Sequence, residues 1–247
     1  MRVPRLRTDW ERHRARLDAL REAKPNYDLA QHHAFTRERG WNHDAYEAEL
    51  PPEPPGPPLP RGAWAIARQL VHDYAFPDPR LITGVFVPDT PLEGRPMLLR
   101  ARFLFFTFWF GVRVNSVIDE ERGEGDERAR VWGYSYTTLE GHFEQGQITF
   151  EVWKYVATGR VVFRVHAFSK PGRIRNPFYR IGFRLFGRGL QRRFARQAQA
   201  RMQQFVREEL EALRKAEPAP ERETVDVQPA AAEPKAEQKL GAMNQGP

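Results

Sequence analysis

The sequence predicts an α+β fold in which a curved antiparallel sheet wraps around one long C-terminal helix. The predicted elements run as a helix, then a series of strands, then a single long helix. That order lacks the strand–helix alternation of a doubly wound fold. The stretch FLFFTFWFGV, residues 103–112, is apolar enough for burial on both faces, which a sheet closed around a helix provides.

The two ends of the chain differ from its centre. Thr8-Asp9-Trp10-Glu11 is a capping-box pattern and predicts a helix over 9–23, inside an N-terminal helical arm, residues 1–40. The sheet-and-helix domain is expected over 41–215. Residues 216–247 are dominated by Pro, Ala and Glu and are predicted to be a disordered tail, because they bury too little apolar surface to offset the entropy of ordering.

Within the central domain, the proline-dense stretch PPEPPGPPLP, residues 51–60, is either a stiff linker or a segment packed on the domain. A helix is expected over 63–74, and residues 26–50 show no clear period. Residues 97–118 form one bent strand or two, with Gly111 as the expected bulge. Further strands are predicted over 81–87, 130–139, 147–156 and 160–169. Asn176-Pro177 is typical of a helix start and begins a helix that runs to about residue 216.

Positive charge gathers near the C-terminal helix. Residues 152–207 hold fourteen Lys or Arg and no Asp or Glu, in a chain of net charge +7. Five arginines form an i, i+4 ridge on that helix, at Arg180, Arg184, Arg188, Arg192 and Arg196. The ridge fits a solvated face paired with acidic segments, or docking on an anionic membrane surface. Nucleic acid is the least favoured partner, because no recognition motif accompanies the charge.

Composition excludes several classes of site. The chain has no cysteine, so disulfides, thiolate metal sites and cysteine nucleophiles are absent. No histidine spacing matches a familiar metal site, and we expect neither a metal nor another cofactor. No secretory signal is visible, and the longest apolar run is about half of the roughly 20 residues that a spanning helix needs. We therefore expect a cytoplasmic protein, with peripheral membrane contact as the alternative.

Residues 133–146, GYSYTTLEGHFEQG, resemble the signature of the domain-of-unknown-function family numbered nineteen-ninety. FRVHAFSKP at 163–171 and QRRF at 191–194 resemble it too, and residues 50–58 and 76–80 look like the longer bacterial members. The resemblance implies a START-like or polyketide-cyclase-like helix-grip fold, with a cavity between sheet and helix. Many proteins of that group bind lipids or other apolar molecules there, and some catalyse.

This chain departs from the family pattern at two positions. Thr137 stands where Gly is usual, and Gln147 stands where a second Glu is common. An amide cannot exchange a proton near neutral pH, so Gln147 cannot replace an acid or base. The departure weakens the case for catalysis.

Strand alternation places Trp132, Tyr134 and Tyr136 on one face of the predicted strand. Rings with polar tips fit the wall of a ligand pocket, although a core–solvent boundary explains them equally well. The predicted pocket also includes aromatic residues from the apolar run and the C-terminal helix: Phe105, Trp109, Phe183 and Phe186.

His142 and Glu144 lie between two glycines, Gly141 and Gly146, as expected for a turn. Their side chains either hold the turn amides or form an acid–base pair that acts with the Tyr136 hydroxyl in a hydrolase or cyclase. We favour the first interpretation and assign no catalytic residue. The predicted function is therefore binding of a small apolar or amphipathic ligand in the sheet–helix cavity.

Overall fold

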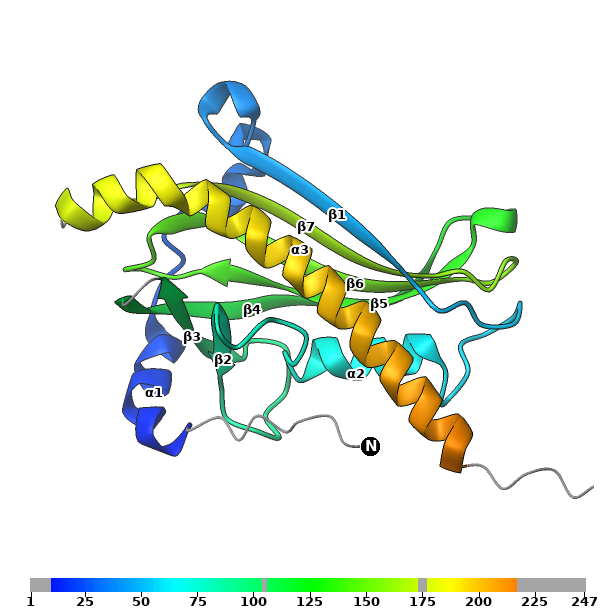
Figure 1. Cartoon of the computed structure of the whole chain (residues 1–247). Coiled ribbons are helices and arrows are strands. Elements are labelled where there is room, and N and C mark those ends of the chain that lie inside the picture. The colour runs from blue at the N-terminus through cyan, green and yellow to red at the C-terminus, as the bar shows by residue number, and fades with distance from the viewer. Residues whose placement is uncertain (1–9, 104–105, 173–176, 217–247) are drawn as a thin grey trace, which may run out of the picture. The chain divides into compact units, whose positions relative to one another are not determined.

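A computed structural model describes residues 10–103, 106–172 and 177–216; along 177–188 it describes the helix without its side chains. The described residues lie in one compact unit. Its centre is a curved seven-stranded antiparallel sheet with the order β1-β7-β6-β5-β4-β3-β2. The long helix α3 (Pro177–Ala216) crosses one face of this sheet, next to α2 (Ala63–His72) (Figure 1). This arrangement is a helix-grip fold and confirms the predicted fold class.

The sheet is built from seven strands along the described chain. The strands are β1 Asn42–Leu50, β2 Ile82–Val85, β3 Pro96–Phe103, β4 Phe106–Arg122, β5 Ala129–Thr138, β6 Glu144–Tyr155 and β7 Val161–Pro171. The N-terminal helix α1 spans Arg14–Glu22, and short 3-10 turns occupy Glu11–His13, Leu29–Ala34, Arg37–Arg39 and Gly125–Glu127. The apolar stretch before residue 118 forms two strands, β3 and β4, rather than one.

Two details of the prediction are wrong. The edge strand β1 was not expected, because only Tyr46, Ala48 and Leu50 of its inward positions are large or apolar enough to signal a strand. The bulge in β4 lies between Val114 and Ser116, not at Gly111. Gly111 instead makes room for α1, since a Cβ there would come within 2.3 Å of Leu20.

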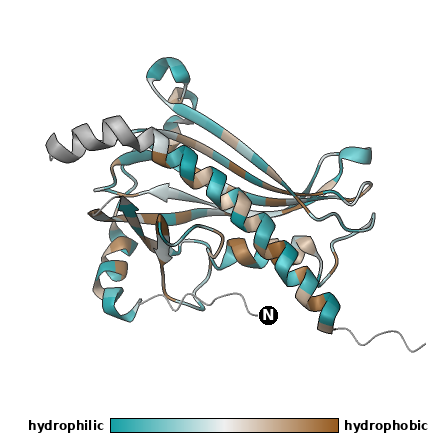
Figure 2. Ribbon diagram, viewed as in Figure 1, coloured by the Kyte–Doolittle hydropathy of each residue, from teal (hydrophilic) through white to brown (hydrophobic). Residues whose placement is uncertain are grey.

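The main core lies between the sheet and the helices α2 and α3, and we call this side of the sheet the gripped face. Figure 2 shows the apolar residues of α2 and of the strands in brown. Along α3, Ala198, Met202 and Val206 are buried against it. The opposite, outer face carries a separate cluster in which α1 packs Leu17 against Val85 and Leu98. The outer face of β5 is covered separately, by the cluster of Ala129 and Val131 with Tyr155 and by the contact of Thr137 with Tyr27, so nearly all residues of β5 are buried.

The proline-dense segment lies against the domain. The ammonium group of Lys154, on β6, is fully buried and donates to the carbonyl oxygen of Pro54 at 2.8 Å and of Pro57 at 3.4 Å. It also pairs with the Glu53 carboxylate at 3.1 Å. The backbone of Gly56 donates to that of Val156. These contacts hold residues 51–60 on the sheet between β1 and α2.

Across the part of the chain that the structure describes, no helix combines the length and the hydropathy needed to cross a membrane.

Candidate functional site

Three tyrosines gather in the middle of the gripped face. Tyr134 and Tyr136 project from β5, and Tyr74, the second residue after α2, contacts them. The hydroxyl oxygens of Tyr74 and Tyr136 lie 3.4 Å apart, a long hydrogen bond in which either atom can donate. Phe150 packs edge-on against the rings of Tyr74 and Tyr134 and at a tilt against that of Tyr136. Trp132, the third predicted pocket residue on β5, is buried in the same cluster.

Tyr74 has an unusual backbone. It follows the last residues of α2 with φ of +50°, in the left-handed region where helices usually place glycine. For an aromatic residue this conformation costs about 1–2 kcal/mol. The ring also needs a gap in β2, because a Cβ on Gly84 would come within 2.6 Å of Tyr74 Cδ1. Two local departures from ordinary geometry thus bring this hydroxyl to the tyrosine cluster.

Burial keeps the three phenols protonated. It raises the pKa of Tyr136 to about 12. The hydrogen bond with Tyr74 lowers this pKa by a smaller amount, and the Glu144 charge adds a small rise. Burial also raises the pKa of Tyr74 and Tyr134, with neighbouring tyrosines adding to the rise. At neutral pH these groups can donate and accept hydrogen bonds but cannot serve as bases.

His142 and Glu144 serve the turn before β6. The backbone N–H of Glu144 donates to His142 Nδ1 at 2.9 Å, and the imidazole packs on Phe110 with ring centroids 4.6 Å apart. Burial lowers the pKa of His142 to about 4, so the ring is neutral at physiological pH. The Glu144 carboxylate accepts from Gln191 of α3. His142 Nδ1 thus accepts from a turn amide rather than facing the Glu144 carboxylate as an acid–base partner.

Of the other predicted pocket residues, the structure places only Trp109, and Trp109 does not join the tyrosine cluster. Trp109 points to the outer face, where its ring lies 4.5 Å from that of His13 and under the guanidinium of Arg16. The reason is alternation: Phe110 and Val112 take the gripped face of β4, so Trp109 takes the other. Phe105 lies outside the described residues, as do the side chains of Phe183 and Phe186.

The predicted arginine ridge is visible only in part. Arg192 and Arg196 are exposed on α3. The side chains of Arg180, Arg184 and Arg188 lie outside the described residues. Docking of this helix on an anionic membrane or on nucleic acid therefore stays a prediction. Among the described residues, no group of three or more His, Asp or Glu side chains is arranged to hold a metal ion.

The two departures from the family pattern both lie on the outer face. The Thr137 hydroxyl donates to the hydroxyl of Tyr27 at 2.8 Å, which ties the N-terminal segment to β5. Gln147 accepts from the side-chain amide of Asn115 at 2.8 Å. An acid at position 147 would project away from Tyr136, so the Gln leaves the tyrosine cluster unchanged.

Sequence reasoning missed two members of the site. Tyr74 was expected to be the last residue of a helix, and Arg95 lies in the turn PLEGRP, which reads as exposed. The structure buries Arg95 to 4% exposure beside this cluster, where its charge acts on Tyr134. Neither position carries a sequence signal, because the burial of each depends on contacts between distant strands and loops.

Comparison with known proteins identifies the family of the chain. A family model described as "Domain of unknown function (DUF1990)" matches residues 26–201. The chain belongs to this family. The DUF1990 match begins at Asn26, the residue whose side chain bonds Thr138 and the Glu144 carbonyl in the β5–β6 hairpin. No curated protein matches the sequence.

Similar solved structures include Ara h 8.0201, with 11% identity, TM-score 0.35 and coverage of 66% of this chain and 98% of that one. A norcoclaurine synthase point mutant from Thalictrum flavum has 10% identity, TM-score 0.40 and coverage of 68% and 95%. A protein of unknown function from Staphylococcus aureus, SA2116, has 11% identity, TM-score 0.37 and coverage of 69% and 98%. At these identities and TM-scores nothing about function transfers to the DUF1990 chain.

Proposed function

We propose that this protein binds a small apolar or amphipathic molecule between the gripped face and α3, without catalysing a reaction. The observation that carries the proposal is the hydroxyl pair of Tyr74 and Tyr136. Two hydroxyls that share one hydrogen bond leave one O–H without an acceptor, and no described residue supplies one. A buried donor left unpaired costs about 1–3 kcal/mol, and phenylalanine at either position would avoid that cost. A ligand oxygen or nitrogen is the partner that this donor fits.

Apolar surface adjoins the hydroxyl pair. Four side chains are only partly buried and pack on the same core cluster: Tyr46, Phe110, Ile148 and Phe194. Of these, Ile148 lies directly opposite Tyr136 across β5 and β6, and Phe110 packs on the ring of His142. A mostly apolar wall with a few polar anchors is the usual composition of a small-molecule site.

The same geometry favours binding over catalysis. An acid–base mechanism needs a group that changes protonation near neutral pH. The pKa of His142 lies near 4 and that of Tyr136 near 12, so each group stays in one protonation state. His142 also commits Nδ1 to the Glu144 amide.

The fluorescence of 6-propionyl-2-(dimethylamino)naphthalene, an apolar naphthylamine probe whose carbonyl oxygen accepts a hydrogen bond, tests the proposal. We expect saturable binding to the wild-type protein and about a threefold to tenfold weaker affinity for Tyr136→Phe, the value of one neutral hydrogen bond. Tyr27→Phe is the matched control, because it removes a hydroxyl from the outer face of the same sheet. Absence of saturable binding, or an equal loss in both variants, would overturn the proposal.

A further inference from the structure

Arg95 is a buried cation on the gripped face. It precedes β3, and its carbonyl accepts from the backbone N–H of Val114 at 3.0 Å. Val114 in turn pairs with Tyr136 across β4 and β5. Residues directly opposite each other in an antiparallel sheet project to the same face. Arg95, Val114 and Tyr136 therefore form a row across the sheet, with the arginine at one end and the phenol at the other.

The guanidinium of Arg95 has few partners. Its Nη2 donates to the carbonyl of Thr90, and the group lies over the Phe86 ring at 5.0 Å. Its Nε is buried and has no hydrogen-bond partner in the described structure. No ion pair among the described residues includes Arg95. A buried charge normally has a close counter-charge, so this one is an exception that needs a cause.

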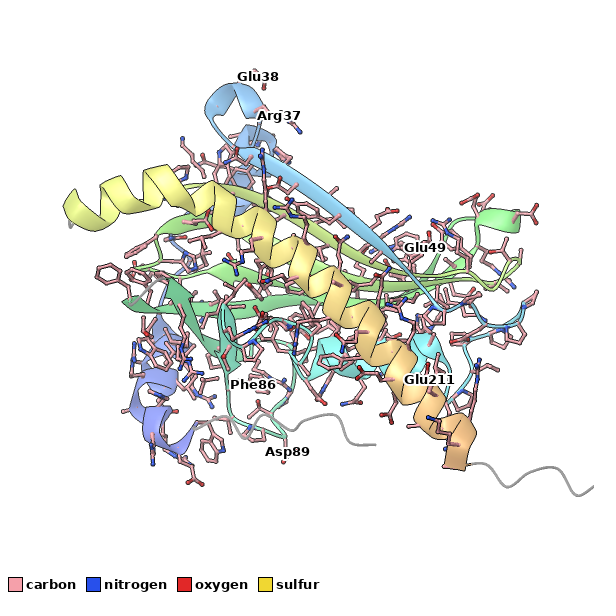
Figure 3. The ribbon with its side chains drawn as sticks, in the orientation of Figure 1. Arg37, Glu38, Glu49, Phe86, Asp89 and Glu211 are labelled. Carbon is pink, nitrogen blue, oxygen red and sulfur yellow. The ribbon has the colours of Figure 1, made fainter. Side chains whose placement is uncertain are left out.

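The nearby acids do not fill that role. The Asp73 carboxylate accepts from Gln69 at 2.8 Å and lies 2.9 Å from His72 Nδ1, so it is committed to the end of α2. Asp89 is exposed at the outer turn of the β2–β3 connection, beyond Phe86 (Figure 3). Burial lowers the pKa of Arg95 more than Tyr134, Asp73 and Asp89 raise it. Among the described residues, therefore, no carboxylate pairs directly with this buried cation.

We propose that Arg95 binds the carboxylate of an amphipathic monocarboxylic acid whose apolar body lies against the tyrosine cluster. This inference rests on the proposed function and names the class of its ligand. A guanidinium matches the plane and spacing of a carboxylate, and its vacant Nε–H is one of the two donors of a bidentate contact. Phe86 lies on the flat face of the guanidinium, so a carboxylate would meet the guanidinium at its edge.

Isothermal titration calorimetry with decanoate and 1-decanol separates charge from apolar binding. The two probes share a chain length and differ in the head group. We expect wild-type protein to bind decanoate about tenfold or more tighter than 1-decanol. Arg95→Met should abolish the preference while 1-decanol affinity stays within about twofold, and Arg95→Lys should retain part of it.

Arg100→Met is the matched control. Arg100 lies on β3, the strand that follows Arg95, and its Nε also lacks a partner, but it projects to the outer face opposite Trp109. This variant should keep the preference for decanoate. Equal affinity of the wild type for both probes, or equal loss of both in Arg95→Met, would overturn the inference and leave the proposed function standing. Binding of neither decanoate nor 1-decanol, nor of the naphthylamine probe, would overturn both.

Discussion

Replacing Lys154 by Met tests how the proline-dense segment is held. The change removes a fully buried ammonium group and leaves the Glu53 carboxylate, itself almost fully buried, without its counter-charge. Glu53 keeps two backbone donors, the N–H groups of Leu59 and Trp64, at 3.0 and 2.8 Å. The carbonyl oxygens of Pro54 and Pro57 lose their only side-chain donor among the described residues.

Breaking a buried ion pair from one side typically costs about 3–5 kcal/mol, because the remaining charge stays desolvated. We expect Lys154→Met to lower the free energy of unfolding by that amount. Adding Glu53→Gln removes the stranded charge, so the double variant should be more stable than Lys154→Met alone. Urea unfolding followed by tryptophan fluorescence measures both, with a constant slope showing that the same surface is exposed.

The matched control is Arg160→Met, which breaks an exposed pair. Arg160 Nε lies 2.8 Å from Glu49 at the end of β1 (Figure 3), with both side chains about half exposed. Such pairs contribute about 0–1 kcal/mol. If Lys154→Met costs no more than Arg160→Met, the buried pair does not hold residues 51–60 and the reasoning fails.

Two further predictions follow from the site. His142 has a folded-state pKa of about 4, below its ordinary 6.5, so its contribution to stability is complete above pH 6.5 and is lost as the pH falls toward 4. The variant His142→Asn should therefore lose up to about 3 kcal/mol less of its free energy of unfolding than the wild type between pH 7 and 4.5. The same pH dependence of unfolding in both proteins would contradict this prediction. Gly84→Ala should lower the free energy of unfolding by about 1–3 kcal/mol, because its methyl group displaces the Tyr74 ring. Gly189→Ala, with open space around it on α3, should be neutral or stabilising by up to about 1 kcal/mol. Equal unfolding midpoints for the two variants would refute the close contact.

The sequence predicts the sheet better than its edges. Strands β5, β6 and β7 follow from the alternation of apolar and polar residues and from the tight turn at 157–159. Strand β1 is hidden because Glu47 and Glu49 occupy its outward positions and few inward residues are apolar. The bulge beside Asn115 leaves no signal, because it depends on how β4 pairs with β5.

The candidate site shows the same division. Tyr134 and Tyr136 are predictable because alternation along one strand needs no long-range information. Trp109 was placed on the wrong face since the run FLFFTFWFGV is apolar at nearly every position and gives no phase. Tyr74 and Arg95 enter the site through a left-handed residue and a turn, whose directions only the folded chain defines.

The polar groups of the outer face show what a purely structural role looks like in this sheet. There the hydroxyls of Ser135 and Thr149 lie 2.8 Å apart, an ordinary hydrogen-bond distance across β5 and β6. Thr137 with Tyr27, and Gln147 with Asn115, form equally short pairs.

On the gripped face of the same strands, Tyr136 meets Tyr74 only at 3.4 Å, and the Nε of Arg95 meets no described partner. Tyr74, Tyr136 and Arg95 are each more than nine-tenths buried, so unused hydrogen-bonding capacity is costly there. A molecule from outside that pairs with both groups would remove that cost. These open groups, rather than the residue types alone, are why we propose a binding site at the tyrosine cluster and Arg95.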